Sequence, residues 1–300
     1  MAISSAYDQA TSFDRARARD PYDGRPSREK AVAAALEEKL GVKAGDVSDE
    51  LNKIRRIKQP EEIDALRRAA QAGAAALVEA MRASEPGVGE WQIDALMTFV
   101  HVREGAEGPA YHGIVASGPN SCSLHYLTSS RTMEKGDVIL IDYGPEVDHY
   151  VTDITRTWPV DGKWTERQAE LYDVVLEAQQ AGIAAVKPGV TMAQVSAVCD
   201  GVLREHGMIG MRPHPACHYV GMEVHDPGGY RVPLEPGAVI TVEPGLYDRK
   251  LGIGIRIEDT VVVTADGCEV LSEGVPKERA AIDALIEQEG LLRTLNRRAE

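Results

Sequence analysis

The sequence is short of cysteine and of positive charge. Its 4 cysteines show no CxxC spacing, which argues against a structural zinc site and favours a reducing compartment. Lysine and arginine total 33 against 47 aspartate and glutamate residues, so the net charge is −14 and no basic cluster is left to neutralise phosphates. We therefore expect neither nucleic acid nor an anionic membrane as a partner.

Long hydrophobic runs are also missing. No stretch approaches the ~20 apolar residues that span a bilayer, and the opening segment MAISSAYDQATSFDR lacks the apolar core of a secretion signal. Both absences favour a cytoplasmic location. The apolar content of 43% is nevertheless enough for a large core, and the length predicts roughly one to two domains.

Two strand-like runs in this sequence each end on an acid. Residues 138–141 and 239–242 are continuous, apolar and rich in β-branched side chains, as in strands that are covered on both faces. The first run ends on Asp142 and the second on Glu243, and the strings GDVILIDYG and GAVITVEPG superpose at an offset of 101. The two runs therefore look like copies of one unit.

Further echoes extend this duplication. The Pro-Gly-Val strings within 85–88 and 187–190 recur at an offset of 102, and Leu-His at His125 is echoed by Val-His at His225 with an offset of 100. A period near one hundred residues is too long for a solenoid repeat and fits two similar halves that each contain helices and strands.

The acids of the two halves form a candidate metal-ligand set. Asp153 follows Asp142 by 11 residues, and Glu258 follows Glu243 by 15. With His218 they offer four carboxylates and one imidazole, which suits a pair of divalent ions such as manganese, cobalt, iron or zinc. We expect these side chains to converge on one centre.

The order of predicted elements is helices followed by strands, twice, which describes an α+β domain with pseudo-twofold symmetry. The predicted helices cover 28–40, 60–81, 90–104, 166–186, 192–206 and 277–300, and the predicted strands cover 113–117, 138–141, 148–160, 218–224, 239–242 and 253–263. Residues 1–53 are polar and uneven and look like an appendage, whereas residues 54–300 are expected to form the catalytic domain.

Four strings then point to a known family. IDYGPEVDHYVTDITRTWPV, HPACHYVGMEVHD, TVEPGLY and GIRIED resemble, in order and spacing, the Xaa-Pro aminopeptidase and prolidase branch of the pita-bread metallopeptidases, over about residues 54 to 280. The resemblance implies the pita-bread fold and a dinuclear peptidase that cleaves N-terminal Xaa-Pro bonds with a metal-bridging hydroxide. It also implies two divalent ions, manganese first among them, a small peptide substrate with proline in second position, and a homodimer.

The resemblance assigns a role to each ligand. The acid matching Asp142 binds one metal, those matching Asp153 and Glu258 bridge both metals, and the residues matching His218 and Glu243 bind the other. Glu243 would also act as general acid and base.

Three other positions acquire roles in the same way. His225 would stabilise the tetrahedral intermediate, His125 would line the pocket for the proline side of the substrate, and Arg256 would support the carboxylate cluster.

Structural interpretations of these residues remain open. His218 and His225 lie seven residues apart, which on a straight strand places them on opposite faces, so that one of them would be a core histidine unless the strand bends or bulges. His125 could be a loop histidine, and Cys217 is expected to be a buried small residue. His214 is expected to be structural or to support the ligands from behind, not to be a ligand itself.

Two departures from the family pattern bear on the substrate. The segment 215–217 reads Pro-Ala-Cys where related sequences carry glycines, which should alter access near His218. The 53 residues of the appendage are too few for the amino-terminal domain of prolidases.

Several other functions stay open. Relatives with the same fold include lyases of dimethylsulfoniopropionate, small-amide hydrolases, methionine aminopeptidase, creatinase and non-catalytic peptide-binding histone chaperones. The complete set of five ligands argues against creatinase and the binding modules, and the string DITRTWPV argues for the prolidase side against methionine aminopeptidase.

Overall fold

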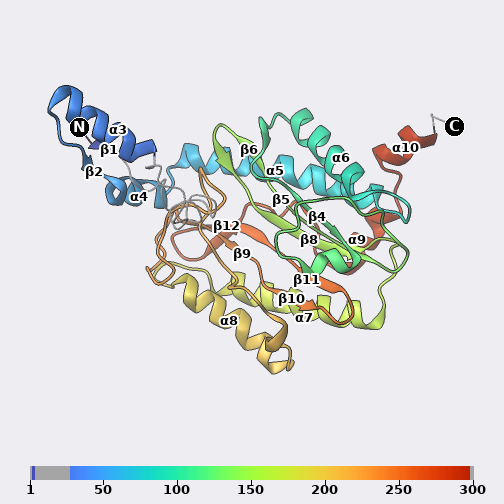
Figure 1. Ribbon diagram of the computed structural model, residues 1–300. Helices are drawn as coiled ribbons and strands as arrows, with labels where there is room; N and C mark the ends of the chain where they lie inside the picture. Colours follow the sequence, from blue (N-terminus) through green and yellow to red (C-terminus); the bar gives the residue numbers. More distant parts are fainter. Residues whose placement is uncertain (1, 4–27, 298–300) are drawn as a thin grey trace. The chain divides into compact units, whose positions relative to one another are not determined.

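The computed structural model describes residues 2–3 and 28–297, which form two compact units, 1–56 and 57–300 (Figure 1). The first unit contains the parallel strand pair β1 (Ala2–Ile3) and β2 (Gly45–Asp46) and the helices α3 (Arg28–Leu40) and α4 (Ser48–Arg56). Helix α3 has its predicted bounds, whereas α4 was missed by the sequence analysis. Residues 4–27 of the predicted appendage and 298–300 of the predicted closing helix lie outside the described residues.

The helices of the second unit start at strong local signals. Pro60 occupies the first turn of α5, where its missing N–H leaves no bond unmade, and Glu62 accepts from the Gln59 backbone N–H at 2.6 Å. Thr165 and Thr191 cap the two helices of the second half, because each threonine side chain accepts from the backbone N–H three residues later. The glutamine at that later position accepts in turn from the threonine backbone N–H. The helices are α5 (Pro60–Ala83), α6 (Glu90–Arg103), α7 (Glu166–Ala185), α8 (Met192–Glu205), α9 (Arg279–Ile286) and α10 (Leu291–Arg297), with 3-10 turns η1 (Gly118–Cys122) and η2 (Ile209–Met211).

The strands form separate small sheets for the two halves. One three-stranded sheet has the order β4-β5-β8 and another has the order β13-β12-β9, all antiparallel, and β3-β6-β7 and β10-β11 form two more. The strands are β3 (Gly108–Pro109), β4 (Ile114–Ser117), β5 (Val138–Tyr143), β6 (Pro145–Val147), β7 (Tyr150–Val151), β8 (Ile154–Pro159), β9 (Val239–Val242), β10 (Gly245–Asp248), β11 (Ile253–Arg256), β12 (Asp259–Val263) and β13 (Cys268–Val270).

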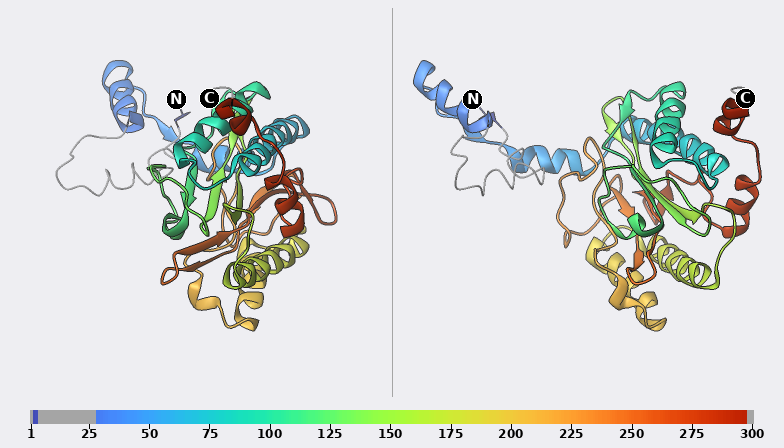
Figure 2. Two further views of the ribbon diagram at one scale, coloured as in Figure 1. Left: turned by 90° about the vertical axis from the view of Figure 1, so that its right-hand side faces the viewer. Right: turned by 45° about the vertical axis from the view of Figure 1, so that its right-hand side comes forward.

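The second unit is layered. Helices α5 and α6 cover one side of the strands, and α7 and α8 cover the other (Figures 1 and 2). Strands β5 and β9 are buried at every apolar position, which explains their continuous apolar sequences. The predicted α+β class and the repeated helix-pair-and-sheet order are confirmed. Among the described residues, no helix combines the length and apolar character that a membrane span requires.

The two halves join through the buried Arg156 of β8. Its Nη2 donates to Asp259 Oδ1 on β12 at 2.7 Å, and both side chains have an exposed fraction of 0%. Nη2 also donates to the backbone oxygen of Val275 at 2.9 Å, and Nη1 donates to the backbone oxygen of Glu258 at 2.5 Å. Burial alone would raise the pKa of Asp259, but the neighbouring charges of Arg156 and Lys277 outweigh it and lower that pKa. The buried acid is therefore charged and paired.

Replacing this arginine should destabilise the fold strongly. Arg156→Met would leave the buried Asp259 with Lys277 as its remaining ionic partner, at 2.6 Å, and would remove the bonds to the backbone oxygens, so we expect the free energy of unfolding to fall by about 3–5 kcal/mol. Urea unfolding measures the change. Arg67→Met is the matched control, because Arg67 pairs with Glu269 at 3.0 Å on the surface, where a pair contributes about 0–1 kcal/mol. Equal losses in the two variants would contradict a special role for the buried pair.

Four predicted elements differ in the structure. Residues 218–224 are irregular apart from one bridge between Tyr219 and Ile240, so the predicted strand is wrong. The predicted strands over 148–160 and 253–263 are each divided, and the closing helix is interrupted between α9 and α10. The interruption falls at Gly290, where glycine is a poor helix former and the Leu291 N–H bonds to Glu79 Oε2 at 3.2 Å.

Candidate metal centre

All eight site residues predicted from the sequence line one cavity of about 310 Å³. Asp142 lies near the end of β5 and Glu243 directly follows β9, the corresponding strand of the other half. Asp153 directly precedes β8, and Glu258 lies between β11 and β12. The lining residues are Leu124, His125, Asp142, Asp153, His214, Pro215, Cys217, His218, His225, Glu243, Arg256 and Glu258. Strand ends from both halves thus bring the acids together.

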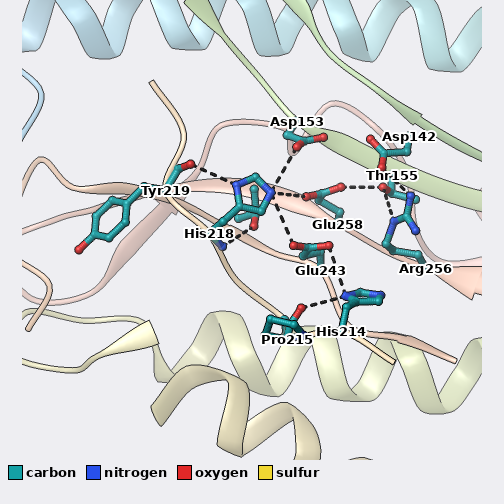
Figure 3. A network of polar contacts seen from close by, with 12 residues as sticks. Asp142, Asp153, Thr155, His214, Pro215, His218, Tyr219, Glu243, Arg256 and Glu258 are labelled. Atoms are coloured by element: carbon teal, nitrogen blue, oxygen red, sulfur yellow. Dashed lines mark hydrogen bonds and ion pairs between the residues drawn. The ribbon is translucent and has the colours of Figure 1, made fainter. Parts of the chain in front are cut away.

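His218 lies at the middle of three carboxylates (Figure 3). Its Nε2 is 3.4 Å from Asp153 Oδ2, 3.6 Å from Glu243 Oε1 and 3.9 Å from Glu258 Oε1. Its Nδ1 is 3.1 Å from the Tyr219 backbone oxygen, which can only accept, so Nδ1 carries the proton of the neutral ring. The lone pair of Nε2 therefore faces the acids, as a metal ligand requires.

Asp142 is held by a cation and a phenol. Arg256 Nη2 donates to Asp142 Oδ2 at 2.5 Å, and Tyr111 Oη lies 2.6 Å from Asp142 Oδ1 and 2.5 Å from Asp153 Oδ1. Arg256 Nε also donates to Thr155 Oγ1 at 3.1 Å, whose hydroxyl donates to Glu258 Oε2 at 2.6 Å. These contacts fix three of the four carboxylates relative to one another.

The carboxyl groups of the cluster differ in pKa. Burial and the charge of Asp142 raise the pKa of Asp153 well above its usual range, and burial and Asp153 do the same for Glu258. Burial also raises the pKa of Glu243. For Asp142 the burial effect is outweighed by the Arg256 charge, and its pKa is lowered. The cluster accumulates more negative charge than its own cations neutralise.

These residues fit divalent metal ions. Glu258 Oε1 is buried and has no hydrogen-bond partner, although its neighbour Oε2 accepts from Thr155. One ligand atom each from Asp153, His218 and Glu258 lies within 4.8 Å of the others. Oxygen-rich ligands with one imidazole match the donor preference of divalent ions, and a cation would relieve both the orphaned oxygen and the mutual repulsion.

His214 and Tyr247 form a layer behind the ligands, which agrees with the expectation that His214 is not itself a ligand. His214 Nδ1 lies 3.7 Å from Glu243 Oε2, and its Nε2 is 3.0 Å from Tyr247 Oη, which accepts from Arg256 Nη1 at 2.7 Å. Burial and the nearby Arg256 charge lower the pKa of His214 to about 4, so the ring is neutral at pH 7. Tyr111 and Tyr247 were missed because neither belongs to a repeated ligand pair.

His218 and His225, which are seven residues apart in the sequence, both line the cavity. Their rings stack with centroids 4.1 Å apart and an interplanar angle of 13°, which the irregular chain between them permits. The chain between them is therefore not a straight strand, and both rings line the cavity instead of opposite faces. Beside His225, Asp226 forms a fully buried ion pair with Lys58 at 2.9 Å, which fixes the chain at this point.

The departure at 215–217 also lies at the cavity. Pro215 and Cys217 line it, and Cys217 is buried with an exposed fraction of 3%. Burial raises the pKa of the Cys217 thiol well above its usual value, in keeping with a protonated packing residue. The segment thus lies where it could affect access near His218, and the altered access stays a prediction.

The protein has the pita-bread architecture, in which two pseudo-symmetric halves face one another. Together they enclose a candidate metal centre of four carboxylates and one histidine. The sequence matches metallopeptidase family M24 over residues 64–265, and the chain belongs to this family. Membership of a metallopeptidase family implies divalent metal ions as cofactors. The predicted family and fold are thereby confirmed.

The chain is similar in sequence and structure to known peptidases. The chain is 39% identical over 267 residues to the Xaa-Pro aminopeptidase of Escherichia coli, covering 79% of this chain and 60% of the relative. It is 37% identical over 231 residues to the Xaa-Pro dipeptidase of Pyrococcus furiosus, covering 76% and 66%. The structure of Escherichia coli aminopeptidase P with the inhibitor Pro-Leu aligns with a TM-score of 0.80 and 35% identity, covering 88% of this chain and 69% of that chain. The chain thus spans less than two thirds of the length of each of these two curated relatives.

Proposed function

We propose that the protein is a dinuclear metal-dependent peptidase that cleaves N-terminal Xaa-Pro bonds, with residues 54–300 as the catalytic domain. The observation that carries the proposal is the convergence of His218 Nε2 with three carboxylates, at 3.4–3.9 Å, inside one cavity. The relatives named as Xaa-Pro aminopeptidase and Xaa-Pro dipeptidase support the substrate class.

Asp142, Asp153, His218, Glu243 and Glu258 would hold the two ions. When bound, such ions lower the pKa of a water molecule to near neutrality and polarise a substrate carbonyl. Manganese is our first choice because four of the five ligands are carboxylates, which suit harder ions, with cobalt, zinc and iron as further candidates.

Glu243 is the proposed general acid and base. Desolvation raises the pKa of its carboxyl group, which would favour taking a proton from water and returning it to the leaving amine. His214 lies 3.7 Å from Glu243 Oε2 on the side away from His218, which holds the carboxylate between two rings. The two rings restrict the orientation of the Glu243 carboxylate, which would accept and then donate the proton.

His225 and His125 would act on the substrate. The stacked ring of His225 is positioned beside His218 to donate a hydrogen bond to the oxygen that becomes negative during hydrolysis. His125 lines the cavity and would contact the proline side of the substrate. Arg256 would act indirectly, by keeping Asp142 charged and in place.

The proposal predicts turnover of proline peptides and its loss on neutralising Glu243. Manganese-loaded protein should cleave Xaa-Pro dipeptides or Xaa-Pro-Yaa peptides, and Glu243→Gln should lower kcat by about 10²–10⁴. Chromatography of the products measures the rates, and metal analysis shows whether Glu243→Gln still binds manganese.

Glu170→Gln on α7 is the control, because it removes an exposed carboxylate that pairs with Arg167 at 2.7 Å and should leave kcat unchanged. Dimethylsulfoniopropionate is assayed in parallel. Turnover of that substrate by protein that cleaves no proline peptide would overturn the proposal.

The homodimer and the cytoplasmic location stay predictions. Sedimentation of the metal-loaded protein tests the first.

A further inference from the structure

Residues 123–131 form a loop that brings His125 to the metal-centre cavity. These residues lie in no helix or strand of the described chain. A segment without ladder hydrogen bonds takes its conformation from side-chain contacts and packing. The orientation of His125 therefore depends on the groups that anchor this loop.

Glu90 is such an anchor. It is the first residue of α6, and its exposed fraction is 0%. Its Oε1 accepts from Ser117 N at 2.7 Å, from Ser117 Oγ at 2.8 Å and from Asn120 Nδ2 at 3.1 Å. Its Oε2 accepts from Tyr126 Oη at 2.8 Å and from Arg131 N at 2.9 Å. One buried carboxylate thus binds the chain before, within and at the end of the loop.

The contact with Tyr126 fixes the residue next to His125. Tyr126 Oη also accepts from Ser130 N at 3.2 Å, so the hydroxyl links Glu90 to the far part of the loop. Leu124 and Tyr126 both pack against a buried apolar cluster. His125 lies between these two anchored side chains, and its own side chain is exposed and lines the cavity.

We propose that Glu90 is a positioning residue that holds His125 in the orientation the reaction needs. The inference rests on the proposed function, because it takes His125 as a substrate-contacting residue. A carboxylate is required here rather than an amide, since all five contacts present an N–H or O–H to Glu90. An amide would turn its own N–H groups toward some of these donors.

Glu90→Gln tests the proposal at the loop itself. Hydrogen–deuterium exchange of manganese-loaded protein should be faster across 123–130 in the variant, with exchange in α7 unchanged. Tyr126→Phe, which removes one of the five hydrogen bonds and keeps the ring, should give a smaller increase in the same segment. Glu104→Gln at the other end of α6 is the control and should match the unmodified protein. Unchanged exchange of 123–130 in Glu90→Gln would overturn the proposal.

A double-mutant cycle tests whether Glu90 acts through His125. Glu90→Gln should lower kcat/KM on a proline peptide by about 10- to 100-fold, because a small displacement of a substrate-contacting group has effects of that size. The loss should fall mainly on KM, as for His125→Ala. In the His125→Ala background, Glu90→Gln should change kcat/KM less than about twofold. Multiplicative losses, or a lower kcat with unchanged KM, would contradict positioning and indicate general destabilisation.

The exchange experiment and the kinetic experiment test the positioning role of Glu90 and the proposed function separately. Protein that cleaves no proline peptide would refute the proposed function, while the exchange arm would still decide whether Glu90 orders the loop.

Discussion

Exhaustive chelation should abolish peptide cleavage and lower the melting temperature. Ions of this kind supply several kcal/mol of transition-state stabilisation, so we expect activity to fall by at least about 10³-fold. Ions at about 100 times their dissociation constant stabilise a folded protein by about 2.7 kcal/mol. For a unit of this size that corresponds to a change of about 5–10 °C.

The stability of the metal-free protein should also depend on pH, and the pKa shifts of the cluster give the direction of that dependence. The pKa values of Asp153 and Glu258 are raised in the folded state, so the folded chain holds more protons there than the unfolded chain. Their contribution to stability therefore falls as pH rises above about 4. Between about pH 5 and about pH 8, the melting temperature should decline more in chelated protein than in manganese-loaded protein.

Calorimetry of both forms measures these shifts, and restoring manganese should recover the activity and the melting temperature together. Activity that survives exhaustive chelation would refute the metal-dependent mechanism.

The sequence was sufficient to predict the elements that carry strong local signals. Residues 138–141 and 239–242 were recognised because buried strands have continuous apolar sequences, and the acids at their ends recur in a fixed arrangement. The four central helices were recognised because each begins at a capping residue or proline with an acid or amide shortly after it.

Contacts that depend on distant parts of the chain could not be predicted in this way. Glu90 looks like an ordinary acid in the first turn of a helix, and its five donors come from residues 27 to 41 positions later. Tyr111 precedes β4 in a segment without periodicity, yet it contacts two of the acids. The stacking of His218 on His225 required an irregular chain, which the alternating pattern of a strand does not reveal.

Arg156 shows the same limit for a structural residue. An arginine within a strand is usually read as solvent-facing, whereas here the whole side chain is buried and joins the two halves. Its partner Asp259 lies 103 residues away. Sequence periodicity identifies which face of an element is apolar, but it does not identify a charged side chain whose partner arrives from another sheet.

Neutralising Glu258 should stabilise the metal-free protein while it destroys the metal centre. Burial and the charge of Asp153 raise the pKa of Glu258, and its Oε1 has no hydrogen-bond partner. At a pH where Glu258 is ionised, Glu258→Gln removes one negative charge, and its amide can donate toward the neighbouring acids while its oxygen keeps the bond from Thr155. We expect the metal-free melting temperature to rise, by an amount that corresponds to about 0.5–2 kcal/mol.

The same variant should lose the manganese-induced rise in melting temperature and the peptidase activity, because one of the proposed metal ligands is missing. Glu90→Gln is the matched control, since it makes the same substitution at another fully buried glutamate. Glu90 accepts five hydrogen bonds, so its neutralisation should lower stability by about 1–3 kcal/mol and leave the manganese-induced rise in place. Opposite signs in the two variants would show that Glu258 is retained for binding metal at a cost in stability. A destabilised Glu258→Gln that still responds to manganese would show that this glutamate serves the fold instead.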